Sequence, residues 1–310
     1  MKTCSFTRRL LSLLLCLALL PVLYAGAGGD QAAATPIHIT VDGDILPPDG
    51  EGLYLYVMPL LGADCMLLVQ AGQTMLVDMG KRNDLPVIQE HLDRLGIDRI
   101  DIAFNTHPHS DHIGGMVDLA QAYPVGRFIT VFPLDFVGPS VMQNHTINNL
   151  KKMRVPIERM RGGDAFALGQ AQVRVMKTSH TNINGASAML HIQYGDTSLL
   201  LAADVNRVAQ SRLNLNHGDQ LRADVLKYPH HGQEKLDESF TRTINPGLAL
   251  ITHGSANTLE GQKWLDRFEV PYLFASWGLI SLHSDGTAIQ VTQALSEDSR
   301  GIRERWEAGR

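Results

Sequence analysis

From Leu53 onwards the chain alternates short apolar runs with turns that are rich in glycine and aspartate. Short apolar runs bounded by such turns are typical of β-strands. The runs that we interpret as strands are residues 53–57, 65–69, 74–77, 100–104, 188–194, 198–202, 223–227, 248–252, 272–274 and 288–291. The turn at residues 71–73 joins two of them, and the turn at residues 195–197 has a hairpin pattern.

Apolar residues at helical spacing indicate helices between some of these strands. Residues 86–95 place Ile88, Leu92 and Leu95 on one face, and a second helical pattern covers residues 259–268. Strands that alternate with helices are consistent with an α/β fold. The chain has no strong repeat and no long internal linker, so we predict one domain over residues 53–292.

The middle of the chain, residues 116–165, is less periodic and carries a basic run. The run consists of Lys151, Lys152 and Arg154, followed by Arg159 and Arg161. Such a run is most often solvated helix or loop surface, and the alternative is a rim that attracts anions beside an active site.

The first 27 residues have the pattern of a secretory signal peptide. Basic residues precede a nearly unbroken apolar run at residues 10–24, and Ala25-Gly26-Ala27 matches the small-x-small cleavage pattern. The run is short for a bilayer span, which takes roughly 20 residues. We therefore predict cleavage rather than a retained anchor, no membrane span afterwards, and a periplasmic or secreted location.

Two polar segments flank the predicted domain. Residues 28–52 are rich in Gly, Ala, Pro and Asp and are interpreted as a linker, and residues 293–310 as a polar C-terminal tail. Removing residues 1–27 takes away three basic residues and no acidic one, so the formal charge falls from −5 to −8. This charge argues against stable binding to nucleic acid by bulk electrostatics. Cys65 alone remains after cleavage, and its apolar surroundings favour a buried structural thiol.

The most informative stretch follows directly on the run at residues 100–104. His107, His109, Asp111 and His112 place four metal-binding side chains within six residues. Imidazole and carboxylate groups suit zinc and other first-row divalent ions. In an extended segment alternate residues point the same way, so His107 and His109 can reach one ion together. A histidine-rich solvent loop explains this spacing less well than a metal site does.

The HxHxDH pattern followed by Gly114-Gly115 resembles the signature of the metallo-β-lactamase superfamily. Further segments occur in the order seen in ComEC-like members, which include the metallo-β-lactamase-like domain of the DNA-uptake channel protein. These segments are residues 62–65, 76–80, 105–107, 184–187, 199–204 and 226–232. The resemblance covers roughly residues 53–292 and implies a four-layer αββα sandwich.

The resemblance also implies a ligand set for two divalent metal ions. His107 and His109 match ligands of the first ion, and Asp111 and His112 match ligands of the second. Asp204 matches the carboxylate that bridges both ions, although an isolated Asp at a strand end is ordinarily a turn or capping residue.

The pair His230-His231 supplies the last imidazole of the second ion. The sequence leaves open which of the two coordinates; we favour His231 as the ligand, with His230 either supporting a ligand from behind or facing the substrate. Asp111 and His230 are the residues that we expect to take part in catalysis.

Two departures from the family pattern concern other histidines. Classical members carry a Gly-His-Thr-Pro-Gly-type motif before the bridging Asp, whereas here His180 lies nearby but out of register. Whether His180 is a ligand stays open, and without it the first site would suit manganese rather than zinc. His253 stands where ComEC-like chains continue to a further His, and it fits either substrate contact or a structural role.

Two cations that share one water lower its pKa towards neutral and so supply a hydroxide nucleophile. We therefore expect an exported metal-dependent hydrolase, with a phosphodiester as the first substrate hypothesis because the resemblance is to a nuclease-like branch. A small or cell-envelope ester fits the acidic chain better than polymeric DNA. The alternatives are a hydrolase of C–O or C–N bonds, as in lactones and β-lactams, and a metal-binding envelope protein without turnover.

Overall fold

The computed structural model describes residues 34–253 and 260–300, and within them the strands form two sheets. The nine-stranded sheet runs β1 (Ile37–Val41), β16 (Ile289–Gln293), β15 (Ile280–Ser284), β2 (Leu53–Val57), β3 (Met66–Gln70), β4 (Gln73–Val77), β5 (Ile100–Asn105), β6 (Val125–Thr130) and β7 (Ile157–Arg159). The seven-stranded sheet runs β14 (Tyr272–Phe274), β13 (Leu248–Ile251), β12 (Val225–Lys227), β11 (Thr197–Leu201), β10 (Met189–Tyr194), β9 (Ala171–Met176) and β8 (Ala165–Leu168).

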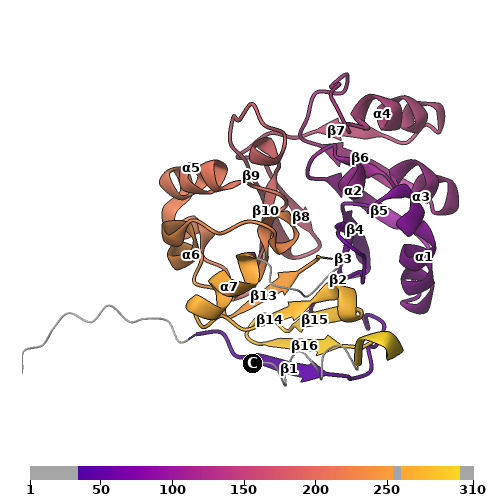
Figure 1. Ribbon diagram of the computed structural model, residues 1–310. Helices are drawn as coiled ribbons and strands as arrows, with labels where there is room; N and C mark the ends of the chain where they lie inside the picture. The colour runs from indigo at the N-terminus through magenta and orange to yellow at the C-terminus, as the bar shows by residue number, and fades with distance from the viewer. Residues whose placement is uncertain (1–33, 254–259, 301–310) are drawn as a thin grey trace, which may run out of the picture. The chain divides into compact units, whose positions relative to one another are not determined.

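Helices cover the outer face of each sheet (Figure 1). The helices α1 (Leu85–Arg94), α2 (Ser110–Ile113), α3 (Met116–Ala122) and α4 (Gln143–Lys152) belong to the half drawn in indigo and magenta. The helices α5 (Arg207–His217), α6 (Glu238–Ile244) and α7 (Glu260–Arg267) belong to the orange half. The order of layers is therefore helix, sheet, sheet, helix, which confirms the predicted αββα sandwich.

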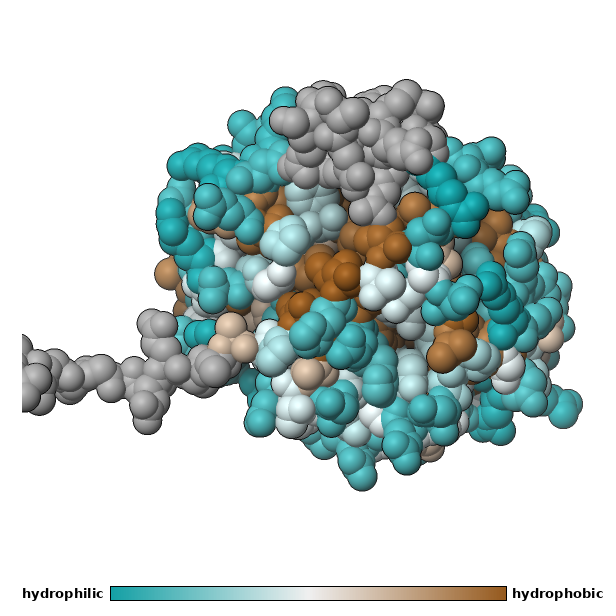
Figure 2. Space-filling view, turned by 90° about the horizontal axis from the view of Figure 1, so that it is seen from below, coloured by the Kyte–Doolittle hydropathy of each residue, from teal (hydrophilic) through white to brown (hydrophobic). Residues whose placement is uncertain are grey.

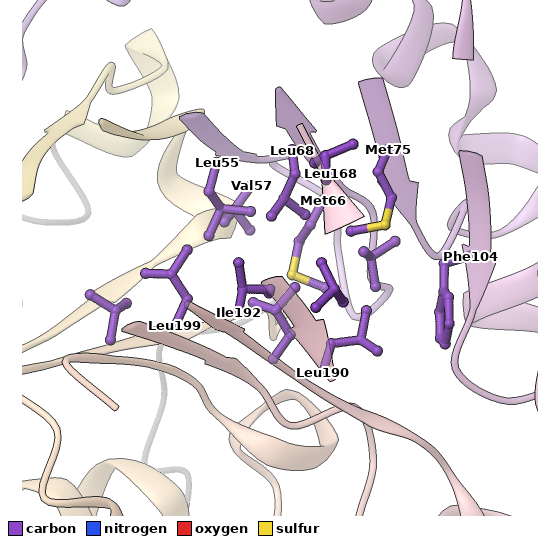
Figure 3. Packing of buried hydrophobic residues seen from close by; sticks show 14 of the residues in the cluster. Leu55, Val57, Met66, Leu68, Met75, Phe104, Leu168, Leu190, Ile192 and Leu199 are labelled. Carbon is purple, nitrogen blue, oxygen red and sulfur yellow. The ribbon is translucent and has the colours of Figure 1, made fainter. Parts of the chain in front are cut away.

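Three apolar clusters hold these layers together. The first lies between the sheets, where Leu68 and Met66 of β3 face Leu190 and Ile192 of β10 (Figure 3). The second and third join each sheet to its helices, with Phe128 and Phe240 among their fully buried members. Strand β3 is buried on both faces, which explains why it appears in the sequence as a continuous apolar run.

The two sheets are mixed, and their parallel parts position the functional region. Strands β4, β5, β6 and β7 are parallel neighbours, as are β11, β12, β13 and β14. Strands β9, β10 and β11 form an antiparallel meander, and the β10–β11 hairpin is the one predicted from its turn. The carboxyl ends of parallel strands share one edge of a sheet. Residues that follow β5 therefore lie at this edge of the nine-stranded sheet, and residues that follow β11 and β12 lie at the corresponding edge of the seven-stranded sheet.

The flanking segments differ in part from the expectation. The interpretation of residues 28–52 as linker requires correction, because Ile37–Val41 forms β1, which pairs in parallel with β16. In the expected tail, Arg300 forms an ion pair with Asp42 at 3.0 Å. The proposed signal peptide at residues 1–27 lies outside the described residues, and among the described helices none is long and apolar enough to cross a membrane.

The surface is mixed in character. Figure 2 shows one face, seen from below, on which hydrophilic residues surround a group of hydrophobic ones near the centre. Cys65 is buried, in agreement with the prediction of a structural thiol.

Candidate metal centre

Four imidazole rings converge on one carboxylate where the two sheets meet. Asp204 follows β11, and its Oδ2 lies 3.3 Å from Nε2 of His112 and 3.6 Å from Nε2 of His107. The same oxygen lies 3.8 Å from Nε2 of His231 and 3.9 Å from Nε2 of His230. Residues far apart in the sequence are thus brought together around Asp204.

The remaining two residues of the HxHxDH motif extend this cluster on either side. Nδ1 of His109 lies 3.1 Å from Nε2 of His107, so these two nitrogens can face one ion. Asp111 lies on the other side, with Oδ2 at 3.4 Å from Nε2 of His231 and Oδ1 at 4.0 Å from Nε2 of His112. The cluster therefore has two neighbouring parts that share Asp204.

Several buried atoms of the cluster lack a hydrogen bond of good geometry within the described residues. They are Nε2 of His112, Nε2 of His231 and Oδ1 of Asp204. Buried polar atoms are nearly always satisfied, so three orphaned atoms in one place need an explanation. A divalent cation would supply it, because the donor set of imidazole nitrogens and carboxylate oxygens suits zinc and related ions. The residues present therefore fit a metal centre.

Asp78, to which the sequence analysis assigned no role, orients the motif histidines. It directly follows β4 and accepts a hydrogen bond from Nδ1 of His112 at 2.7 Å. It also accepts bonds from the backbone and hydroxyl of Thr106, and that hydroxyl lies 3.1 Å from Nδ1 of His107. Fixing Nδ1 turns Nε2 of each ring towards Asp204, which is the usual way in which proteins orient metal-binding histidines.

A second buried carboxylate, Asp64, does the same for His231. Its Oδ1 lies 3.1 Å from Nδ1 of His231 and accepts a hydrogen bond of 2.7 Å from the hydroxyl of Thr252. Its Oδ2 is paired with the ammonium of Lys227, which also donates to the carbonyl of Ala203 at 3.2 Å. Lys227 and Asp64 are fully buried. The sequence carried a signal for both aspartates, since they stand in segments 62–65 and 76–80 of the resemblance.

The electrostatics of the cluster favour bound positive charge. Burial lowers the pKa of His107 well below its usual value, and the charge of neighbouring His112 lowers it further. Burial acts in the same direction on His231, but Asp204 and Asp64 outweigh it and raise its pKa to about 9. Burial opposes ionisation of Asp111, yet the interaction with His231 lowers its pKa to about 2. The carboxylates thus hold protons on nearby imidazoles, which a metal ion would displace on binding.

Four residues around the cluster have unusual backbone φ angles. Asp78, Ala203, His230 and His231 have φ angles of 56°, 46°, 50° and 54°. Residues other than glycine rarely occupy this left-handed region, and such strain gathers at functional sites. Gly114 and Gly115 pack closely on the backbone, since a Cβ atom would lie 2.2 Å from the carbonyl oxygen of Ser110 at Gly114 and 2.2 Å from that of Met79 at Gly115.

The family model of the metallo-beta-lactamase superfamily matches residues 58–254, more than half of the chain. The chain belongs to the metallo-β-lactamase superfamily. No curated protein sequence matches the chain.

Solved structures resemble this member of the superfamily at low sequence identity. The metallo-beta-lactamase fold protein YhfI from Bacillus subtilis is 12% identical with a TM-score of 0.50, covering 74% of this chain and 100% of that one. CmlA, a diiron beta-hydroxylase from Streptomyces venezuelae, is 14% identical with a TM-score of 0.49 over 76% of this chain. Rm3 metallo-beta-lactamase is 21% identical with a TM-score of 0.45, over 62% of this chain and 81% of that one. The chain spans about half, 55%, of the CmlA chain.

His230 and His231, between which the sequence did not decide, differ in burial and in neighbours. His231 is buried with Nε2 facing Asp111 and Asp204, whereas His230 is 23% exposed. Nδ1 of His230 lies 3.2 Å from Glu234, and its Nε2 lies 3.3 Å from the amide of Asn184. His230 therefore lies at the exposed rim of the cluster.

His180 lies in the loop between β9 and β10 and makes its contacts within that loop. Its Nδ1 accepts a hydrogen bond of 2.9 Å from the backbone of Asn182, and its ring packs against Gly185. Within the described residues it belongs to none of the groups of His and Asp that could hold a metal ion. His253 follows β13 and is partly buried.

Proposed function

We propose that this superfamily member is a hydrolase with two divalent metal ions held on either side of Asp204. The convergence of four Nε2 atoms on one oxygen of Asp204 carries the proposal. The first ion would be held by His107, His109 and Asp204, and the second by Asp111, His112, His231 and Asp204. Zinc suits this donor set, and manganese is the alternative for a first site without His180.

Members of the superfamily are mostly metal-dependent hydrolases, although CmlA is described as a diiron beta-hydroxylase. Bound divalent ions would supply a Lewis acid and lower the pKa of water, which removes the need for a Ser or Cys nucleophile. The donor set here is rich in imidazole, with carboxylates at Asp111 and Asp204. This composition supports hydrolysis as the reaction to test first.

Two residues of the chain would handle the water and the substrate. The carboxylate of Asp111 is 30% exposed and has a low pKa, because its interaction with His231, 3.4 Å away, outweighs the opposing effect of burial. Ionised Asp111 can accept a hydrogen bond from the attacking water, orient it and take up its proton. His230 is held by Glu234 and Asn184 at the rim, where its ring can contact the substrate.

The substrate that we propose is a small or cell-envelope phosphodiester. The order of the ComEC-like segments supports it, since that branch includes a domain of a DNA-uptake channel protein. The acidic chain disfavours a long nucleic acid, so the substrate is expected to be small. The signal-peptide pattern at residues 1–27 supports export to the periplasm or the medium.

The test is hydrolysis of bis(p-nitrophenyl) phosphate by the purified protein after loading with zinc or manganese. Asp111→Ala should abolish metal-dependent turnover, while Asp98→Asn, at an exposed site outside the cluster, should leave it unchanged. A parallel assay offers a γ-lactone and a β-lactam. Turnover of either of these without turnover of the diester would contradict the phosphodiester proposal, and turnover of none with both metal ions bound would contradict hydrolysis itself.

A further inference from the structure

Two basic side chains lie at the same edges of the sheets as the metal centre but outside it. In the nine-stranded sheet Asn105 of β5 pairs with Thr130 of β6, and Thr130 pairs with Arg159 of β7. These three residues form a row across parallel strands, and His107 stands two residues beyond Asn105. Arg159 is therefore two strand spacings, about 10 Å, from the strand that carries the motif.

The opposite sheet repeats this arrangement with a lysine. Val175 of β9 pairs with Leu190 of β10, which pairs with Leu201 of β11, three residues before Asp204. Lys177 directly follows β9, and β9 runs in the same direction as β11 because both are antiparallel to β10. Lys177 thus lies at the same edge as Asp204 and also two strands, about 10 Å, away from its strand.

The side chain of Lys177 is held in place by its neighbours. Its ammonium lies 5.3 Å from the centre of the Phe132 ring, and the Phe136 ring packs against Phe132 at 5.2 Å. The aliphatic part of Lys177 runs past Gly162, where a Cβ atom would come within 2.9 Å of it. Lys177 is only partly exposed, so it does not extend freely into solvent.

The charges around this pair are uncompensated. Within the described residues, no carboxylate forms an ion pair with Arg159 or Lys177. Burial lowers the pKa of Lys177, and the positive charge of Arg159 lowers it further. Holding a half-buried ammonium beside a second cation costs free energy, which a bound anion would offset through charge-assisted hydrogen bonds.

We propose that Arg159 and Lys177 together bind a second anionic group of the substrate, a phosphate monoester, about 10 Å from the strands that carry the metal centre. This inference rests on the proposed phosphodiesterase function and narrows it to diesters that carry an additional phosphate. The same placement distinguishes these two residues from the run at Lys151 and Lys152, which ends α4 on exposed surface.

The kinetic test uses two chromogenic substrates that differ by one phosphate. They are thymidine 5′-(p-nitrophenyl phosphate) and the same compound with a 3′-phosphate. The unaltered protein should show a KM about 10-fold lower for the 3′-phosphorylated compound, which corresponds to one charge-assisted contact. Arg159→Gln and Lys177→Met should each raise the KM for the 3′-phosphorylated compound and so reduce that advantage, and Lys152→Gln, a matched exposed control, should retain it.

A binding measurement separates this inference from the proposed function. Calorimetry compares thymidine 3′,5′-bisphosphate with thymidine 5′-phosphate on the metal-loaded protein, so it needs no turnover. Loss of the preference for the bisphosphate in Arg159→Gln supports the site even if neither ester is hydrolysed, in which case the proposed function alone fails. If both esters are hydrolysed and Arg159→Gln still prefers the bisphosphate, the inference is overturned and the proposed function stands. Arg159 is exposed, so this variant should fold if Lys177→Met does not.

Discussion

Replacing Lys227 by methionine removes the ammonium group that neutralises Asp64 in the interior beside the metal centre. Both side chains are fully buried, and Asp64 also contacts His231 and Thr252. Burial would raise the pKa of Asp64, but the charge of Lys227 and then that of His231 lower it instead. In Lys227→Met, Asp64 would therefore remain a buried charge that has lost its closest partner.

The expected loss of stability follows from these contacts. Breaking a buried ion pair by removing one partner typically costs about 3–5 kcal/mol. His231 at 3.1 Å and the Thr252 hydroxyl at 2.7 Å still satisfy part of Asp64. We therefore expect the lower end of that range, about 3 kcal/mol.

Urea unfolding followed by circular dichroism in the presence of a chelator measures this loss. Lys235→Met is the matched control, because Lys235 is 56% exposed and pairs with Glu260 at 3.3 Å on the surface. That variant should lose less than about 1 kcal/mol. The double variant with Asp64→Asn should lose clearly less than the sum of the two single losses, because the neutral pair leaves no uncompensated charge. A loss below about 1 kcal/mol in Lys227→Met, or additive losses, would show that Lys227 does not stabilise the buried charge of Asp64.

Three further predictions concern metal affinity, packing and pH. Asp78→Asn should weaken metal affinity by about 10–100-fold in a chelator competition, because His112 loses the carboxylate that orients it; unchanged affinity would count against that role. Gly115→Ala should lower the unfolding free energy by about 1–3 kcal/mol, since its Cβ would press on the Met79 carbonyl, and a parent-like thermal midpoint would contradict this packing. Burial lowers the pKa of His191, so the unfolded chain takes up its proton first as the pH falls below about 6.5. His191→Gln should therefore lose less stability than the parent between about pH 7 and pH 5.5, and equal losses in both proteins would show that His191 does not contribute.

The parts of the fold that were predictable are those whose strands are mostly apolar. Strands β2, β3, β4 and β5 are buried along nearly their whole length, so the sequence shows each as an apolar run. Helix α4 lies in the stretch that appeared less periodic, and its buried face includes Gln143 and Thr146 beside Ile147 and Leu150. Strand β1 is mostly exposed and is stabilised by pairing with β16, which no local pattern reveals.

The candidate site was predictable where its residues stand together in the chain. The spacing of His107 to His112 marks the motif without any knowledge of the fold, whereas Asp204 and His231 were assigned through the family resemblance. The roles of Asp64 and Lys227 depend on a contact between residues 163 positions apart, which follows from the packing of one sheet on the other. The choice between His230 and His231 likewise depends on a strained turn whose backbone angles the sequence does not specify.

The metal centre itself is tested most directly by anomalous diffraction from crystals of the zinc-loaded protein, recorded on both sides of the zinc absorption edge. We expect two anomalous peaks per chain, both in contact with Asp204, one beside His107 and His109 and the other beside Asp111, His112 and His231. A single peak away from Asp204, or no peak at the cluster in zinc-loaded crystals, would contradict this expectation.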